Sequence, residues 1–163
     1  MKNFLFYTSK AWSPLFIRIM LGMVFFAHGG QKLMGWFGGY GFDASMIYFT
    51  DTRGLPWIVG FFIIILEFFG SLALIAGLAT RLWSLAFVFL NIGIILTSHA
   101  DYFFMNWYGS QAVEGYEYFL LAIGMATSLV FSGAGRYSFD RMLTTKPTAH
   151  AATGNVWNHA VLE

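Results

Sequence analysis

Apolar residues run along the chain in four long stretches, separated by shorter polar or glycine-rich segments. The stretches cover residues 14–34, 56–78, 82–99 and 116–131. Each approaches the roughly 20 residues that an α-helix needs to cross a bilayer, and each is too long for a strand of a membrane barrel. Only helices and closed barrels satisfy their backbone hydrogen bonds in lipid. The pattern therefore predicts an all-α fold, an integral membrane four-helix bundle.

The segments between the stretches differ in character. Phe42, Met46 and Phe49 recur at helical spacing between the first two stretches, which predicts a short helix on the membrane surface. The first stretch follows about a dozen residues and lacks a small-residue cleavage site, so we expect it to be retained rather than removed as a signal peptide. We expect the membrane domain to cover residues 1–143. The Thr- and Ala-rich tail, 144–163, is expected to be disordered or ordered by a partner.

Composition supports the membrane interpretation and removes several kinds of chemistry. The chain is 58% hydrophobic and 10% charged, whereas soluble domains are about 25% charged. Most of its surface should therefore face lipid. The net charge of +1 comes without a basic run, which argues against a nucleic-acid partner. Because there are no cysteines, the chain cannot itself hold a disulfide, an iron–sulfur cluster or a covalent haem.

The basic residues are unevenly distributed between the two sides of the predicted bundle. The side that holds both termini carries most of them: Lys2, Lys10, Arg81, Arg136, Arg141 and Lys146, with Arg18 near the edge. The other side carries Lys32 and Arg53. Since short cytoplasmic segments are enriched in Lys and Arg, we expect both termini in the cytoplasm and the two aromatic-rich loops outside.

One costly polar residue falls on each predicted helix. These residues are His28, Glu67, His99 and Glu117. A charge at the bilayer centre costs about 2.5–3.5 kcal/mol on insertion scales, so such residues usually face the bundle interior. Lys32 lies one turn beyond His28 on the same helix face. With a rise of about 1.5 Å per residue, the set clusters in the outward half of the membrane. This predicts a polar pocket with Glu67 at its floor.

Simpler roles are available to the same side chains. Lys32 could snorkel to the outer interface, and Glu117 could be favoured at a helix start by the dipole. His99 could be a hydrated loop residue, and Glu67 could be protonated and join two helices by a hydrogen bond.

A metal site is another possibility, since His and Glu are metal ligands. However, Glu67 and His99 differ in depth by roughly 15 Å on straight helices, and the Glu-x-x-His pair of di-iron bundles does not occur. We therefore predict no metal site. The same offset argues against a haem held between His28 and His99.

Four segments resemble the DoxX family of small bacterial and archaeal membrane proteins. They are "RIMLGMVFFAHGGQKLMGWFGG", "ILEFFGSLALIAGLATR", "GYEYFLL" and "GAGRYSFDRML", in this order within residues 14–143. The resemblance implies a four-helix bundle in the cytoplasmic membrane and a link to quinone-dependent redox systems such as thiosulfate:quinone oxidoreductase. The motif residues that it carries over are His28, Gln31, Lys32, Glu67, Glu117, Arg136, Tyr137 and Asp140.

Two functions follow from the residues and the resemblance together. In the first, the chain is a subunit of a quinone-linked oxidoreductase. His28 and Glu67 would then be catalytic, and a quinone or quinol head group would bind His28, Gln31, Lys32, His99 and Glu117. Electrons would come from a partner subunit, because the chain has no redox centre of its own. In the second, it is a non-catalytic structural or assembly subunit of a larger membrane complex or a homo-oligomer.

Overall fold

The computed structural model describes residues 6, 8–99 and 101–144, without the side chains of residues 98 and 99. This part of the chain is helical and contains no strand. In order, the elements are α2 (Ser13–Met34), η1 (Trp36–Gly38), α3 (Gly41–Ile47), η2 (Tyr48–Thr52), α4 (Trp57–Ile65), η3 (Leu66–Gly70), α5 (Ser71–Ala76), α6 (Thr80–Ile94), η4 (Ile95–His99), α7 (Glu117–Ser132) and α8 (Phe139–Thr144). The predicted tail, apart from Thr144, lies outside the described residues.

Three helical stretches are long and apolar enough to cross a membrane. They are Ser13–Met34, Trp57–Ala76 and Thr80–Thr97, with 22, 20 and 18 residues. At about 1.5 Å per residue, each spans roughly the 30 Å of a hydrocarbon core. A fourth apolar helix, α7, is shorter at 16 residues. The prediction of an all-α membrane protein is thus confirmed, with helix boundaries within a few residues of the apolar stretches.

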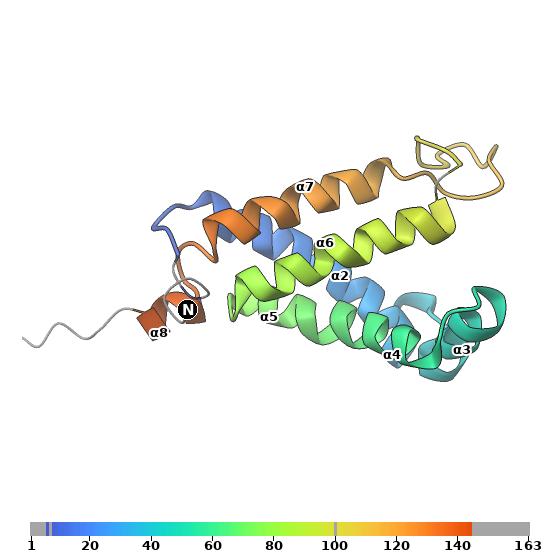
Figure 1. Ribbon diagram of the computed structural model, residues 1–163, viewed down its shortest axis with the longest axis horizontal. Helices are drawn as coiled ribbons and strands as arrows, with labels where there is room; N and C mark the ends of the chain where they lie inside the picture. Colours follow the sequence, from blue (N-terminus) through green and yellow to red (C-terminus); the bar gives the residue numbers. More distant parts are fainter. Residues whose placement is uncertain (1–5, 7, 100, 145–163) are drawn as a thin grey trace, which may run out of the picture.

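The helices pack as two antiparallel pairs that run along the long axis (Figure 1). α6 packs against α7, and α2 packs against α5 and η3 on one side and α7 on another. Most of the core lies where these helices meet: Leu21, Phe25, Leu74, Phe87, Leu90, Ala122, Ala126 and Leu129. We call the two ends of the bundle the α8 end and the loop end; α3 and the 101–116 segment lie at the loop end (Figure 1).

Arg18 joins three segments at the α8 end. Its side chain is 1% exposed. The guanidinium donates to the carbonyls of Leu74 and Ile75 at the end of α5. It also donates to three carbonyls between α7 and α8, those of Ala134, Arg136 and Tyr137. The five N–H donors of an arginine are therefore all used, and carbonyls that the helix end would leave unpaired are satisfied.

Asp140 from α8 fixes the tight connection between α5 and α6. Its carboxylate accepts hydrogen bonds from the backbone N–H groups of Ala79 (2.6 Å) and Thr80 (2.9 Å). Those N–H groups belong to the first turn of α6, where a carboxylate is favoured by the exposed donors and by the helix dipole. The motif residue Asp140 thus has a structural role, closing the α8 end of the bundle.

The helix predicted between the first two spans is present as α3 and the π-helical segment η2. The apolar stripe that predicted it faces the bundle: Met46 and Phe49 are buried and pack with Ile64 of α4, while Phe42 packs at the edge of this cluster. The short helix therefore covers the loop end of α2 and α4.

Candidate functional site

Lys32 and Glu67 form an ion pair inside the loop-end half of the bundle. The Nζ atom of Lys32 lies 2.5 Å from Oε2 of Glu67. The Glu67 side chain is 3% exposed and that of Lys32 is 27% exposed. A carboxylate so deep in an apolar environment carries a desolvation cost that only a close cation or strong hydrogen bonds can offset. Lys32, on the neighbouring helix α2, supplies this cation for Glu67.

Gly29 and the π-helical segment η3 set the position of Glu67. A Cβ on Gly29 would lie 2.5 Å from the backbone nitrogen of Phe68. The backbones of α2 and η3 can therefore approach each other this closely only because position 29 is glycine. Glu67 lies inside the π-helical segment η3. Each hydrogen-bonded turn there contains one more residue than a turn of an α-helix, so the helix is wider at this point. Close packing and local widening together bring its carboxylate within reach of Lys32, on the neighbouring helix α2.

His28 and Gln31 accompany the ion pair on α2. His28 lies one turn before Lys32, lines the same cavity, and interacts electrostatically with Lys32 and Glu67. Gln31 lies on the same helix but does not line the cavity. The structure thus brings together three predicted site residues, His28, Lys32 and Glu67.

These residues form part of the wall of a cavity of about 940 Å³. Its walls are mostly apolar, with residues from α2, η2, α4, η3, α6, η4, the 101–116 segment and α7. The polar lining residues that were not predicted to belong to a site include Arg53 after η2, Glu114 of the 101–116 segment and Tyr118 on α7. Arg53 donates to the hydroxyl of Tyr48 (2.6 Å) at the cavity rim. The three π-helical segments, η2, η3 and η4, all contribute wall residues, and such segments recur at functional sites.

Tyr118 is one of the cavity residues that the sequence analysis missed. Its hydroxyl has no hydrogen bond within the part of the chain that the structure describes, and it interacts electrostatically with Glu67. The signal was present in "GYEYFLL", one position after Glu117. Selecting residues by formal charge passes over a neutral phenol, although buried tyrosine hydroxyls usually have a partner.

Glu117 serves the loop rather than the cavity. Its carboxylate accepts hydrogen bonds from the Met105 backbone N–H and the Trp107 indole, both at 3.0 Å. Glu117 begins α7, as the simpler interpretation of this residue expected, and does not line the 940 Å³ cavity. His99 ends η4, and its side chain lies outside the described part. Thr97 of the same segment lines the cavity.

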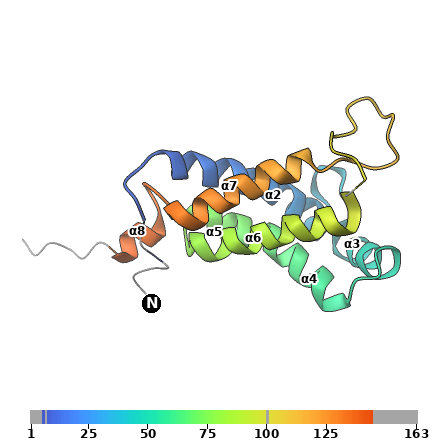
Figure 2. The ribbon, with the colours of Figure 1, turned by 45° about the horizontal axis from the view of Figure 1, so that its top comes forward.

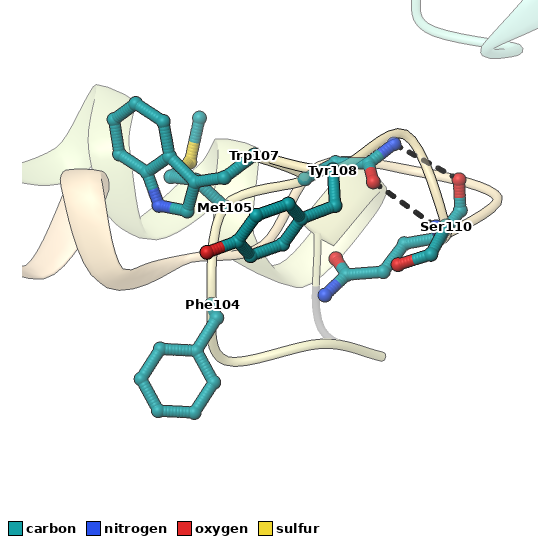
Figure 3. A pocket seen from close by; sticks show the side chains of 7 residues that line it. Phe104, Met105, Trp107, Tyr108 and Ser110 are labelled. Carbon is teal, nitrogen blue, oxygen red and sulfur yellow. Dashed lines mark hydrogen bonds between the residues drawn. The ribbon is translucent and has the colours of Figure 1, made fainter.

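A second, smaller hollow of about 300 Å³ lies within the loop itself. Asn106 shapes it through two hydrogen bonds with the Gln111 backbone, each 3.0 Å long. Figure 3 shows Trp107 and Tyr108 to the left of these bonds and Phe104 pointing away from them. The residues around this hollow carry no formal charge, so it offers less chemistry than the cavity beside Lys32 and Glu67.

Fold and site together define a small all-α membrane protein with a buried ion pair in the wall of an apolar cavity. The family model of DoxX matches residues 13–100. The chain belongs to the DoxX family. It is 34% identical over 83 residues to a Bacillus subtilis (strain 168) protein described as "Putative oxidoreductase CatD". The match covers 51% of this chain and 57% of that relative. No solved structure is significantly similar to this chain.

Proposed function

We propose that this protein is a small membrane subunit of a quinone-linked redox system, and that its cavity binds a quinone-like head group. The observation that carries the proposal is the Lys32–Glu67 ion pair, which lies with His28 in the wall of a largely apolar cavity. Charges are kept at such depth chiefly where they serve a ligand, a proton or a partner. The description of the Bacillus subtilis relative as an oxidoreductase points to the same chemistry.

The residues present fit a quinone. Ligand pockets are about 300–1,000 Å³ in volume, mostly apolar, with a few polar groups that fix orientation, and this cavity has about 940 Å³. Phe25 and Phe119 supply aromatic wall, which suits a flat ring. Lys32 uses one of its three N–H donors on Glu67 within the described residues, and Tyr118 offers a hydroxyl. The two carbonyl oxygens of a quinone lie on opposite sides of its ring, and each would then have a hydrogen-bond donor.

The proposed role of each residue follows from the proton or charge that its side chain can carry. A bound quinone supplies reversible two-electron, two-proton chemistry. His28 can both accept and donate a proton, so it is the residue to exchange protons with the ring. Glu67 holds Lys32 in place and keeps its charge next to the head group. Because the chain has no cysteine, electrons must come from a cofactor or from a redox centre of a partner subunit.

The proposal is tested by quinone binding to the purified protein in lipid nanodiscs, measured by quenching of tryptophan fluorescence with a tail-less methylated naphthoquinone. His28→Ala should weaken binding at least about tenfold, the cost of one charge-assisted hydrogen bond. Val24→Ala is the matched control, because Val24 lies on the same helix and is 41% exposed on the lipid-facing surface. Absence of binding by the unmodified protein would refute the quinone site.

We also propose that four helices cross the cytoplasmic membrane of a bacterium or archaeon, with both termini in the cytoplasm. The start of α2 and helix α8 lie at the same end of the bundle, and most basic residues belong to that end. Single cysteines at Asp43 and Ser110, both exposed, should react with an impermeant reagent from outside intact cells. Met142→Cys, at a residue 72% exposed on α8, should react only after lysis. The reverse pattern would invert the topology.

A second candidate function, assembly of a larger complex, is favoured by the loop between η4 and α7. Trp107 and Tyr108 are 77% and 95% exposed, although hydrogen bonds from Glu117 and Asn106 hold the loop in shape. Exposed aromatic side chains in an ordered loop are typical of interface anchors. If Trp107→Ala releases co-purifying chains while quinone binding is unchanged, the loop is the assembly surface. Retention of those chains would argue against this role.

A further inference from the structure

The cavity that we propose as a quinone site has an opening between α4 and α6. Figures 1 and 2 both show these helices diverging toward the loop end. At the other end, α6 packs closely against α5 and η3. The cavity therefore has a back wall on α2 and α7, two side walls on α4 and α6, and a gap that faces the surrounding lipid.

The polar residues of the cavity lie at its back and at its loop end. The back carries His28 and Lys32 of α2 and Tyr118 of α7, with Glu67 beside them, and the loop end carries Tyr48, Arg53, Thr97 and Glu114. The side walls carry apolar stripes at helical spacing, with Val59, Phe62, Ile63 and Leu66 on α4 and Ala86, Phe89, Leu90 and Gly93 on α6. A molecule that fills the cavity would meet hydrogen-bonding groups at the back and hydrocarbon at the gap.

Phe62 and Phe89 mark the gap itself. Both line the cavity, yet they are 61% and 66% exposed. A residue can satisfy both descriptions only at the mouth of a cavity. Because one lies on α4 and the other on α6, the mouth opens sideways, toward the region that lipid chains fill.

Gly93 gives independent support for an opening at this place. Five other helical glycines, Gly22, Gly29, Gly30, Gly60 and Gly70, have a neighbour within 3.0 Å of a built Cβ, so each permits a close contact with another segment or side chain. A Cβ at Gly93 would meet nothing within 4 Å. Glycine in a helix interior costs about 1 kcal/mol relative to alanine, and here no packing contact explains it. Its absent side chain widens the gap between α4 and α6.

We infer that the ligand is a ring with a long hydrocarbon tail, and that the tail leaves the cavity through the α4–α6 gap into the bilayer. This inference rests on the proposed quinone site and adds its substrate class: a prenyl-tailed quinone that enters and leaves within the membrane. The head group contacts the back wall, and the tail passes between Phe62 and Phe89. A ring without a tail, once bound at the back wall, would leave the α4–α6 gap empty.

Cysteine protection tests this route, because the chain has no cysteine of its own. Phe89→Cys is compared with Phe131→Cys, a lipid-facing phenylalanine of α7 that is 77% exposed and far from the cavity walls. Each variant in nanodiscs reacts with a small lipid-permeable maleimide. A polyprenyl naphthoquinone should slow labelling of Phe89→Cys at least about tenfold and leave Phe131→Cys unchanged. The same ring without a tail should bind and protect neither.

The outcomes separate the two proposals. If the tailed ring binds but Phe89→Cys stays fully reactive, the tail takes another path and this inference fails, while the quinone site stands. If the tail-less ring protects Phe89→Cys equally, the head group lies in the gap and the inference also fails. If neither ring binds, the quinone site itself is refuted.

A second pair of variants needs no labelling. Gly93→Phe places a ring in the gap, and Gly124→Phe places the same ring on the exposed face of α7, where a built Cβ also meets nothing within 4 Å. Gly93→Phe should weaken binding of the tailed quinone at least about tenfold relative to Gly124→Phe. Equal affinities of these two variants would overturn the route.

Discussion

The two ends of the bundle each contain a cation from α2, buried at one end and half-buried at the other, and the two cations have different partners. At the α8 end, Arg18 donates to five backbone carbonyls and is 1% exposed. At the loop end, Lys32 contacts one carboxylate and is 27% exposed, beside a cavity of about 940 Å³. A cation whose donors are all used by the backbone holds the fold together. A cation with donors to spare next to a cavity can serve a ligand.

The same contrast extends to the acidic partners. Asp140 accepts hydrogen bonds from two backbone N–H groups at the start of α6. Both oxygens of its carboxylate are therefore used by the backbone. Glu67 accepts from a side chain of another helix, and both groups line the cavity. We therefore expect substitutions at the α8 end to change stability most, and substitutions at the loop end to separate stability from ligand binding.

The largest effect should come from Arg18→Met. It removes five donors from a buried site, and the loss of one partner from such a network costs about 3–5 kcal/mol. Reversible unfolding in mixed detergent, followed by circular dichroism, should show this loss in the free energy of unfolding. Arg53→Met is the control at the loop end, because Arg53 bonds one exposed hydroxyl and should lose under about 1 kcal/mol. Equal stability of the two variants would contradict the conclusion that Arg18 holds the segments at the α8 end together.

A smaller loss is expected for Glu67→Leu. The change leaves the Lys32 ammonium beside an apolar cavity without its carboxylate, which should cost about 1–3 kcal/mol. The loss is below that of Arg18→Met because Lys32 is partly exposed and water can reach it. The double variant Lys32→Met/Glu67→Leu should regain much of the stability, because no unpaired charge remains. A double-mutant cycle with no coupling would mean that the ion pair contributes nothing.

The sequence predicted the membrane helices well because length and apolarity alone determine which segments can cross a bilayer. It also predicted one polar pocket for His28, Lys32, Glu67, His99 and Glu117, of which the structure places His28, Lys32 and Glu67 in the cavity wall and leaves Glu117 outside it. It could not predict the ion pair, which depends on how closely Gly29 approaches Phe68 and on the widened turn at Glu67. Such details of helix packing leave no periodic signal.

Arg18 and Glu117 show a second limit of sequence reasoning. The sequence placed Arg18 among the basic residues at the membrane edge, yet it is buried and bonded to backbone carbonyls. Glu117 bonds a loop whose conformation decides its partners. In both cases the partner is mainly backbone, and every residue offers the same backbone groups. The residue types therefore do not reveal which segment will be bound.

Asp140→Ala should lower stability by about 1–2 kcal/mol, the usual cost of losing a side chain that caps a helix start. Asp140→Asn is an intermediate variant, because its amide keeps one acceptor oxygen but sets its NH2 donor against the second backbone N–H, and it should retain only part of the stability. Thermal unfolding of the three proteins in the same detergent measures the difference. Quinone binding by the folded Asp140→Ala protein should be unchanged, since Asp140 lies at the opposite end from the cavity. If Asp140→Asn is as stable as the unmodified protein, the two hydrogen bonds to the start of α6 contribute little.

The smallest change in stability should come from Tyr118→Phe. This variant should separate ligand binding at the loop end from stability most clearly. The Tyr118 hydroxyl has no hydrogen-bond partner among the described residues, so its loss should shift the free energy of unfolding by less than about 0.5 kcal/mol. If that hydroxyl donates to a ligand carbonyl, binding of the tail-less naphthoquinone should weaken about three- to tenfold, the value of one neutral hydrogen bond. Tyr137→Phe at the α8 end, on a side chain 75% exposed, should change neither quantity. A loss of stability without a loss of binding would make Tyr118 a structural residue and leave His28 and Lys32 as the donors for the head group.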